Sequence, residues 1–272
     1  MNVLVAVYSR VAVWNLPPAH VEQLRRAFPQ HAFLHARNHA EALEHVPQAD
    51  VLFASNVRPT HITAASRLRW FHTPVAGVGH LLFPELAASD ILFTNGRGMS
   101  AGTIAEHVVG VTLAMFRKLP QAVRAQAARE WAQDEIATPP ACRMIAGSTV
   151  LVVGLGAIGT AVAQALSALG ARVIGIKRNV PEVLPRGVDA IHTPDRLRSL
   201  LPSADVVVLA AAETSETRHM IGREALAAMR KDACLVNVSR GGLIDEGALI
   251  DAIAAGHLAG VALDVFEQEP LP

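Results

Sequence analysis

Residues 149–170 read TVLVVGLGAIGTAVAQALSALG, and this stretch decides the fold of the second half of the chain. Its apolar start predicts a buried strand, the glycine spacing G-x-G-x-x-G predicts a tight turn, and the following apolar residues predict a helix ending at Gly170. Glycines in this arrangement let the chain reverse, let a pyrophosphate approach the backbone, and let helix and strand pack closely, while the helix N-terminus attracts phosphate. The turn therefore predicts a dinucleotide site with contacts from Gly154, Gly156, Ala157, Ile158 and Gly159.

The pattern around this stretch indicates an α/β protein with two doubly wound lobes. Short apolar runs alternate with helical stretches, which is typical of parallel sheets with crossover helices. We expect a flavodoxin-like lobe over residues 1–98 and a Rossmann dinucleotide-binding lobe over residues 99–272. A helix expected from Thr103 to Leu119 is apolar nearly all round, which favours burial between the lobes or against the partner chain of a homodimer. Pro120 would end or bend this helix, and Trp131 beyond it would pack or contact the partner.

The composition favours a small-molecule partner. Hydrophobic residues make up 51% of the chain and charged residues 18%, as expected for sheets covered on both faces. Lysine plus arginine and aspartate plus glutamate number 24 each, so no overall field attracts nucleic acid or an anionic membrane. The first apolar run is too short for a signal peptide, and no run reaches the roughly 18 apolar residues of a membrane span. We therefore expect a cytoplasmic protein.

Neither the cysteines nor the histidines are spaced for a metal. Cys142 and Cys234 stand far apart in the chain, which gives little support to a disulfide framework or a zinc site. His31, His35 and His39 would share one face of a helix, but the segment HAFLHA reads as a short strand. We predict no metal site.

Lys177-Arg178-Asn179 follows the second strand of the dinucleotide lobe, where an NAD-selective site carries an acidic residue. A carboxylate there would accept a hydrogen bond from the ribose 2′-OH and repel a 2′-phosphate. Two cations do the reverse, and arginine offers a planar fork to phosphate. Lys177 and Arg178 therefore favour NADP, with NAD as the alternative. The cations could instead be a solvated strand end, and Arg178 could stack on adenine.

Charged residues also follow two later strands. Arg240 comes after ACLVNVS, and Asp264, Glu267 and Glu269 lie in DVFEQEP. Ligands bind beyond the carboxyl ends of strands in such sheets, so Arg240 could hold a substrate carboxylate and polarise an adjacent carbonyl. The alternatives are a surface ion pair for Arg240 and a merely exposed acid for Glu269.

Three separated motifs carry a resemblance to a known family: VGLGAIG at 153–159, VNVSRGGLIDEGAL at 236–249 and GVALDVFEQEP at 260–270. In the first lobe, HTPVAGVGHLLFPEL is similar to that family's substrate loop, and TNGRGMSAGTIAEHVVGVTLAMFR to its hinge and long helix. Over essentially its whole length the chain resembles the D-isomer-specific 2-hydroxyacid dehydrogenases, which include glyoxylate and hydroxypyruvate reductases and phosphoglycerate dehydrogenase.

The resemblance implies an oxidoreductase that transfers hydride from NADPH or NADH to a small 2-oxo acid of the glyoxylate or hydroxypyruvate type, giving a D-2-hydroxy acid. Residues 1–98 would be its substrate-binding, catalytic domain. Arg240 would bind and polarise the 2-oxo acid, and Glu269 would hydrogen-bond a catalytic histidine and keep it protonated. The remaining implied contacts are Asp264 with the nicotinamide carboxamide, Val238 and Ser239 with the nicotinamide ribose, and the backbone of Val75, Ala76, Gly77 and Val78 with the substrate carboxylate.

The catalytic histidine of the family follows the EP motif and a further strand, whereas this chain stops at Pro272. We expect the C-terminal end of the dinucleotide lobe to be truncated; the alternative is a protein that lacks the acid/base residue. His72 and His80 flank the substrate loop, where packing or substrate contact is the expected role. Two other functions stay open. One is a non-catalytic dinucleotide sensor or corepressor on the same fold, and the other is a different Rossmann enzyme, such as a methyltransferase, with no role for Arg240.

Overall fold

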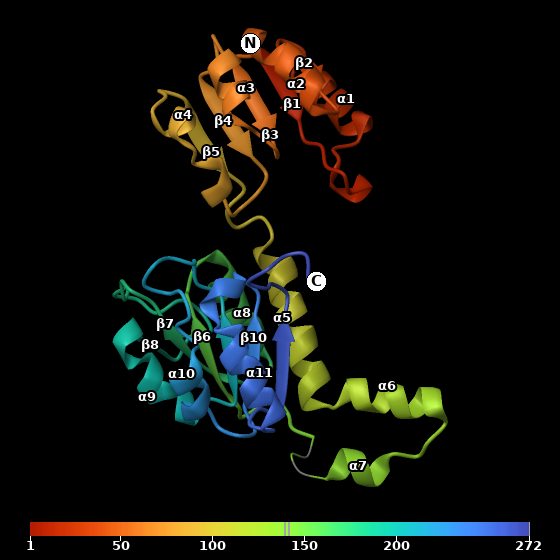
Figure 1. Ribbon diagram of the computed structural model, residues 1–272, viewed down its shortest axis with the longest axis vertical. Coiled ribbons are helices and arrows are strands. Elements are labelled where there is room, and N and C mark those ends of the chain that lie inside the picture. The colour runs from red at the N-terminus through yellow and green to blue at the C-terminus, as the bar shows by residue number, and fades with distance from the viewer. Residues whose placement is uncertain (139, 141, 272) are drawn as a thin grey trace. The chain divides into compact units, whose positions relative to one another are not determined.

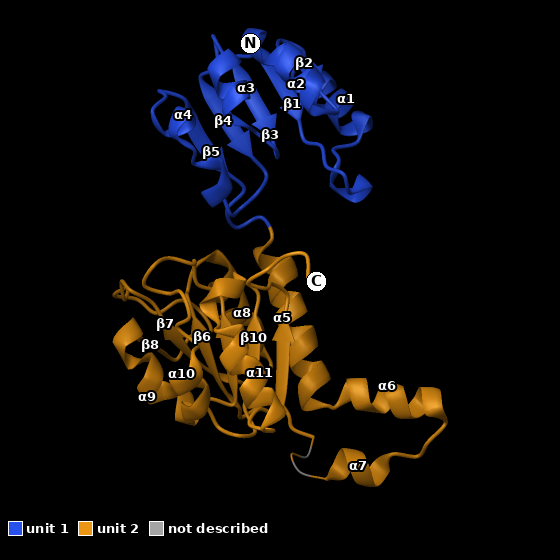
Figure 2. Cartoon of the chain, viewed as in Figure 1, with its two compact units in different colours: residues 1–99 blue, residues 100–272 orange. Residues whose placement is uncertain are grey.

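The computed structural model describes residues 1–138, 140 and 142–271, and the chain divides into two compact units (Figure 2). Unit 1 comprises Met1–Met99 and unit 2 comprises Ser100–Pro272. Each unit builds its own sheet, of five strands in unit 1 and six in unit 2, and every strand pair is parallel. The predicted α/β class with two parallel sheets is therefore confirmed.

Unit 1 has the strand order β2-β1-β3-β4-β5, which is the doubly wound order of flavodoxin-like folds. Its core surrounds the central strands, where Leu4, Leu52 and Phe71 are almost fully buried. The segment HAFLHA forms a strand, as predicted. The elements of unit 1 are β1 (Asn2–Ala6), α1 (Pro18–Ala27), β2 (Ala32–His35), α2 (His39–His45), β3 (Val51–Ala54), α3 (Pro59–Ala64), β4 (Trp70–Thr73), α4 (Pro84–Ala87) and β5 (Leu92–Asn95).

Unit 2 has the strand order β11-β10-β9-β6-β7-β8, which is that of a Rossmann sheet (Figure 1). The apolar runs STVLVVG, ARVIGIK, ADVVVLA, ACLVNVS and LAGVALDVF each contain one of its strands, and the short β8 is additional. The elements of unit 2 are α5 (Ala101–Phe116), α6 (Leu119–Ala128), α7 (Gln133–Ala137), β6 (Thr149–Val153), α8 (Ala157–Ala168), β7 (Arg172–Ile176), β8 (Ala190–His192), α9 (Leu197–Leu200), β9 (Val206–Leu209), α10 (Arg223–Ala228), β10 (Cys234–Asn237), α11 (Glu246–Ala254) and β11 (Gly260–Leu263).

The central strands of unit 2, β6, β9 and β10, are buried on both faces, which explains their continuous apolar runs. In β6, Leu151 and Val153 pack into the core that α10 and α11 cover, whereas Val150 and Val152 pack into the core shared with α5 and α8. This alternation follows from the two-residue period of a strand. None of the helices in the described ranges is long and apolar enough to cross a membrane.

The long helix predicted from Thr103 to Leu119 is α5. It ends at Phe116 instead of Leu119, and Lys118 then takes a left-handed conformation with φ of 51°. Pro120 lies in the first turn of α6, where a proline is tolerated because its missing N–H would have had no helical partner. The long helix thus ends before Pro120, as predicted, and Pro120 itself helps to begin the next helix.

One stripe of α5 is buried, and the rest of the helix surface is not. The buried residues Ala105, Val108, Thr112 and Phe116 recur at helical spacing, and α5 packs along α8. Leu113, on another face, is 36% exposed. The stripe attaches α5 to the dinucleotide sheet and explains part of the apolar character that the sequence shows.

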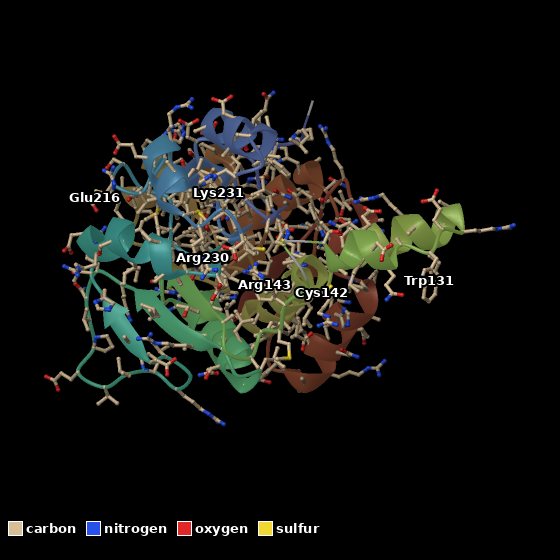
Figure 3. All side chains as sticks on the ribbon, turned by 90° about the horizontal axis from the view of Figure 1, so that it is seen from below. Trp131, Cys142, Arg143, Glu216, Arg230 and Lys231 are labelled. Atoms are coloured by element: carbon tan, nitrogen blue, oxygen red, sulfur yellow. The ribbon has the colours of Figure 1, made fainter. Side chains whose placement is uncertain are left out.

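A charged cluster closes the amino end of the unit 2 sheet, and Figure 3 shows Arg143 and Arg230 together there. Both guanidinium groups contact Asp205, at 3.5 Å from Arg143 and 3.2 Å from Arg230, and Arg143 also donates to the Asp232 carbonyl at 2.6 Å. Beside them Cys234 is buried, and burial raises the pKa of its thiol to about 11. Because ligands bind at the opposite, carboxyl end of such strands, we assign this cluster to stability.

Candidate functional site

The glycine turn after β6 has the geometry that its sequence predicts. Gly154 takes φ of 97°, and a Cβ there would lie 2.6 Å from the backbone of Ala211. A Cβ on Gly159 would lie 1.9 Å from the Gly154 carbonyl oxygen. These two glycines are required by the protein's own packing, one for the turn and one for the close approach of α8 to β6.

Gly156 differs because nothing lies within 4 Å of the Cβ that it lacks. It is the N-cap of α8, and no side chain caps that helix. The first turn of α8 therefore leaves backbone N–H groups, from Ala157 onward, beside open space and at the positive end of the helix dipole. A pyrophosphate fits this position, since glycine at 156 keeps clear the room that a ligand phosphate would take.

The turn lies at the switch point of the sheet. β6 pairs with β7 on one side and β9 on the other, so the connections leave in opposite directions from this point. Ligands of doubly wound sheets bind in the crevice that forms there. The carboxyl edge brings together, in strand order, residues after β11, β10, β9, β6 and β7, among them Asp264, Arg240, Ala211, Gly154 and Lys177.

The two predicted phosphate ligands after β7 have different surroundings. Lys177 is half-buried and makes no ion pair with any residue in the described ranges, whereas Arg178 is exposed and pairs with Glu216 at 2.6 Å. The partner comes from the loop between β9 and α10. The sequence prediction for Arg178 did not include this ion pair.

Asn237 organises the turn that carries Arg240. It is completely buried, its Nδ2 donates to the Arg240 carbonyl at 2.8 Å, and its Oδ1 accepts from the backbone N–H and the hydroxyl of Ser239, each at 3.1 Å. Its own carbonyl accepts from the N–H of Asp264 at 3.0 Å. One buried amide thus links Ser239, Arg240 and Asp264.

The residues after Arg240 pack against the segment that follows β11. A Cβ on Gly241 would lie 1.9 Å from the Phe266 carbonyl carbon, and a Cβ on Gly242 would lie 2.3 Å from Oε1 of Glu213. Position 241 therefore needs glycine, because the DVFEQEP backbone packs directly against it, whereas at position 242 the flexible end of the Glu213 side chain could move aside. The Arg240 side chain is exposed and donates to the carbonyl of Ser239 at 2.6 Å.

The two glutamates of the DVFEQEP segment make different contacts. Glu269 is exposed and accepts from the N–H of Phe266 at 2.9 Å, so its carboxylate closes its own loop. Glu267 instead contacts His219 through a short hydrogen bond and lies 3.6 Å from Arg218. His219 is therefore the histidine that meets this segment within the described residues.

The predicted substrate loop lies in unit 1, at the carboxyl end of β4. Among the described residues, no hydrogen bond has the N–H of Ala76, Gly77 or Val78 as its donor, and that of Val75 has only a long contact of 3.4 Å with the Thr73 hydroxyl. The side chain of Asn95 donates to the Ala76 carbonyl at 2.8 Å and holds the loop at the sheet edge. Consecutive free N–H groups of this kind suit a carboxylate.

The histidines beside this loop have distinct positions. His72 is half-buried in β4, with Nδ1 at 2.8 Å from the Thr94 hydroxyl and its ring stacked on Phe53. His80 is exposed in the turn after the loop. At the same edge of the unit 1 sheet, burial raises the pKa of the Tyr8 phenol above its ordinary value, with a smaller opposing effect of Arg58.

Comparison with known proteins matches the chain to one family. Residues 109–272 match the model of the D-isomer specific 2-hydroxyacid dehydrogenase, NAD binding domain. The chain belongs to this family. It is 34% identical over 233 residues to D-3-phosphoglycerate dehydrogenase of Methanocaldococcus jannaschii, with 85% of this chain and 44% of that protein covered. It is 36% identical over 216 residues to glyoxylate reductase of Thermofilum pendens, with 77% and 61% covered. The chain thus spans about half the length of these relatives.

A solved structure extends the match to both units. The D-isomer specific 2-hydroxyacid dehydrogenase family protein of Aeromonas salmonicida subsp. salmonicida A449 is 31% identical, with a TM-score of 0.83 over 100% of this chain and 83% of that one. The predicted family is therefore confirmed, and unit 2 contains its NAD-binding domain.

Two residues of unit 2, Asn237 and Glu216, were not among the predicted site residues. Asn237 lies inside an apolar run, where one polar residue in a central strand was a usable signal. Glu216 has no such signal, because its proximity to Arg178 depends on two loops 38 residues apart in the chain. The assignments of Arg240, Glu269, Asp264, Val238 and Ser239 stay predictions; of these, Val238 is buried, so its contact with a ligand would be through the backbone.

Proposed function

We propose that the protein reduces a small 2-oxo acid of the glyoxylate or hydroxypyruvate type to a D-2-hydroxy acid with NADPH or NADH. The observation that carries this proposal is the common edge of the unit 2 sheet, where the open glycine turn and the Asn237-held Arg240 turn both lie. A bound nicotinamide would supply the hydride. The similarity to glyoxylate reductase of Thermofilum pendens supports the substrate class.

The proposed substrate contacts are hydrogen bonds donated by the Arg240 guanidinium and by backbone N–H groups. Arg240 would present its fork to the substrate carboxylate and polarise the 2-oxo group, as charge develops on that oxygen during reduction. In unit 1, the free N–H groups of the 75–78 loop would bind a carboxylate. Asp264, held by the Asn237 carbonyl, would accept from the nicotinamide carboxamide, and Ser239 with the Val238 backbone would contact the adjoining ribose.

Glu269 would serve by orienting an imidazole and favouring its protonated form, which gives a proton to the developing alkoxide. In the structure its Oε1 accepts from Phe266, and no histidine in the described ranges contacts it. The alternative function is a non-catalytic dinucleotide sensor or corepressor on the same fold, which would bind the dinucleotide without turnover.

Steady-state assays with glyoxylate, hydroxypyruvate, pyruvate and phenylpyruvate, each with NADPH and NADH, test the proposal. Arg240→Ala should lower kcat/KM by about 10²- to 10³-fold, and Arg240→Lys should recover only part of the loss because it keeps the charge without the fork. Cofactor affinity should stay within about twofold in both variants. Cofactor binding without turnover of any of these acids would refute the enzyme in favour of the sensor.

We infer a preference for NADP from Lys177 and Arg178. The end of β7 lacks the carboxylate that would repel a 2′-phosphate. Both cations follow β7, the strand whose end would lie beside the adenosine ribose of a bound dinucleotide. Equal kcat/KM with NADPH and NADH would refute this inference.

We also infer a homodimer, in which a second copy covers the arm formed by α6 and α7. Neither helix has a buried residue, and Trp131 between them is 90% exposed (Figure 3). The Lys118 ammonium closes the base of the arm by donating to the Thr138 carbonyl at 2.8 Å. An arm without a core needs a covering surface to be stable. A monomer in sedimentation equilibrium at micromolar concentration would refute the dimer.

A further inference from the structure

An ion pair spans the two loops that flank the glycine turn. The guanidinium of Arg178, after β7, donates from Nη2 to Oε2 of Glu216, in the loop after β9, at 2.6 Å. β6 lies between β7 and β9 in the sheet, so the two strand ends stand about 10 Å apart. The pair therefore reaches across the crevice at the end of β6, where the adenosine half of a dinucleotide would lie.

The loop that carries Glu216 has a defined turn. The Thr217 hydroxyl donates to the Ala212 carbonyl at 2.8 Å and accepts from the Thr214 N–H at 2.8 Å. The backbone continues this turn, with the N–H of Arg218 donating to the Thr214 carbonyl at 2.9 Å. Glu216 is thus presented at the rim by an ordered turn, and Figure 3 shows it at the margin of unit 2, well away from the Arg143 and Arg230 cluster.

The other arginine of this loop, Arg218, has carboxylate partners other than Glu216. Arg218, the nearest cation in the Glu216 loop, pairs with Glu213 at 2.9 Å and lies 3.6 Å from Glu267. Both partners of the Arg178–Glu216 pair are exposed, at 69% and 70% of their side-chain surfaces. An exposed pair is weak, so a stronger anion can exchange with the carboxylate.

We propose that Glu216 is a cofactor-specificity residue, which supplies from the β9 loop the carboxylate that is missing from the end of β7. This proposal rests on the proposed dinucleotide site. A 2′-phosphate carries close to two negative charges and binds the Arg178 guanidinium, so it must displace the Glu216 carboxylate. The phosphate and the displaced carboxylate then remain close together and repel each other. A ribose 2′-OH, in contrast, can donate to that carboxylate. Glu216 therefore opposes NADP and tolerates NAD, and it moderates the preference that Lys177 and Arg178 create.

The test compares binding of adenosine 2′,5′-bisphosphate and adenosine 5′-monophosphate by isothermal titration calorimetry, which needs neither nicotinamide nor turnover. Glu216→Gln should tighten binding of the bisphosphate by about five- to tenfold, because a like charge beside the phosphate is removed, and should change that of the monophosphate by less than about twofold. Arg178→Gln should weaken the bisphosphate selectively. In the double variant the gain from Glu216→Gln should shrink, because the fork it released is gone.

Glu224→Gln is the matched control. Glu224 forms an equally exposed pair with Arg198 at 2.7 Å, with 76% and 68% of the side chains exposed, and lies on α10 instead of the β9 loop. It should leave both affinities unchanged. An unchanged ratio of the two affinities in Glu216→Gln, or an equal change in Glu224→Gln, would overturn the role of Glu216 while leaving the dinucleotide site intact. Binding of neither ligand by the unaltered protein would refute the site itself and this proposal with it.

Discussion

Replacing Asn237 by alanine should separate the positioning of Arg240 from its chemistry. The change removes three hydrogen bonds that a completely buried amide makes with the 239–240 turn. At about 1 kcal/mol each, the expected loss in free energy of unfolding is about 3 kcal/mol. Without the amide, the Arg240 carbonyl and the Ser239 N–H lose their partners and the turn can relax.

The activity consequence should be specific to the 2-oxo acid. We expect the KM for the 2-oxo acid to rise and kcat/KM to fall by about 10²-fold, because a displacement near 1 Å of a substrate-positioning group has an effect of that size. Affinity for the adenosine half of the cofactor should change little, since the glycine turn belongs to another loop. Urea unfolding gives the stability, and steady-state kinetics below the unfolding transition give the activity.

Thr112→Val is the matched control. Its hydroxyl is completely buried and donates to the Val108 carbonyl at 2.7 Å, so its hydrogen bond lies within α5. This variant should lose about 1 kcal/mol or less with unchanged KM. If Asn237→Ala lost stability but kept the KM and kcat of the unaltered protein, Asn237 would be a structural residue only and the positioning argument would fail.

Three further perturbations test other parts of the structure. Gly156→Ala should fold normally and weaken dinucleotide binding by about tenfold. Gly159→Ala should lower the free energy of unfolding by about 1–3 kcal/mol, because its Cβ would meet the Gly154 carbonyl oxygen at 1.9 Å. If urea unfolding and binding titrations showed the reverse pattern, the roles assigned to the two glycines would be contradicted. Trp131→Ala should weaken the dimer by about 2 kcal/mol in sedimentation equilibrium, and the exposed Trp14 of unit 1, replaced in the same way, should have no effect. Burial, and to a smaller extent the neighbouring His39, lower the pKa of His61 in the folded protein. Just below pH 6.5 the unfolded chain therefore binds more protons than the folded one, so the free energy of unfolding should rise with pH up to about 6.5 and level off above it. A His61→Gln protein with the same acid dependence of stability would refute this assignment.

The family and the dinucleotide turn were predictable because their signals are local. A strand, its turn and the helix that follows lie within residues 149–170, and the glycine positions report requirements between neighbours in sequence, such as the φ of 97° at Gly154. The central strands of the unit 2 sheet were predictable for the same reason, since burial on both faces leaves continuous apolar runs. The signal of Pro120 was also local, because a proline is compatible both with a helix that ends before it and with one that begins there.

Tertiary structure decided which polar groups meet. The sequence places Lys177 and Arg178 after a strand, which determines their charge and their edge of the sheet, but the partner of Arg178 comes from a loop 38 residues later. Asn237 likewise acquires its role from the turn that it holds at a single buried point. Hydrophobic periodicity determines which face of an element is buried, whereas an ion pair or a buried amide depends on the spatial order of strands. That order places β9 and β7 on either side of β6, and with it Glu216 beside Arg178.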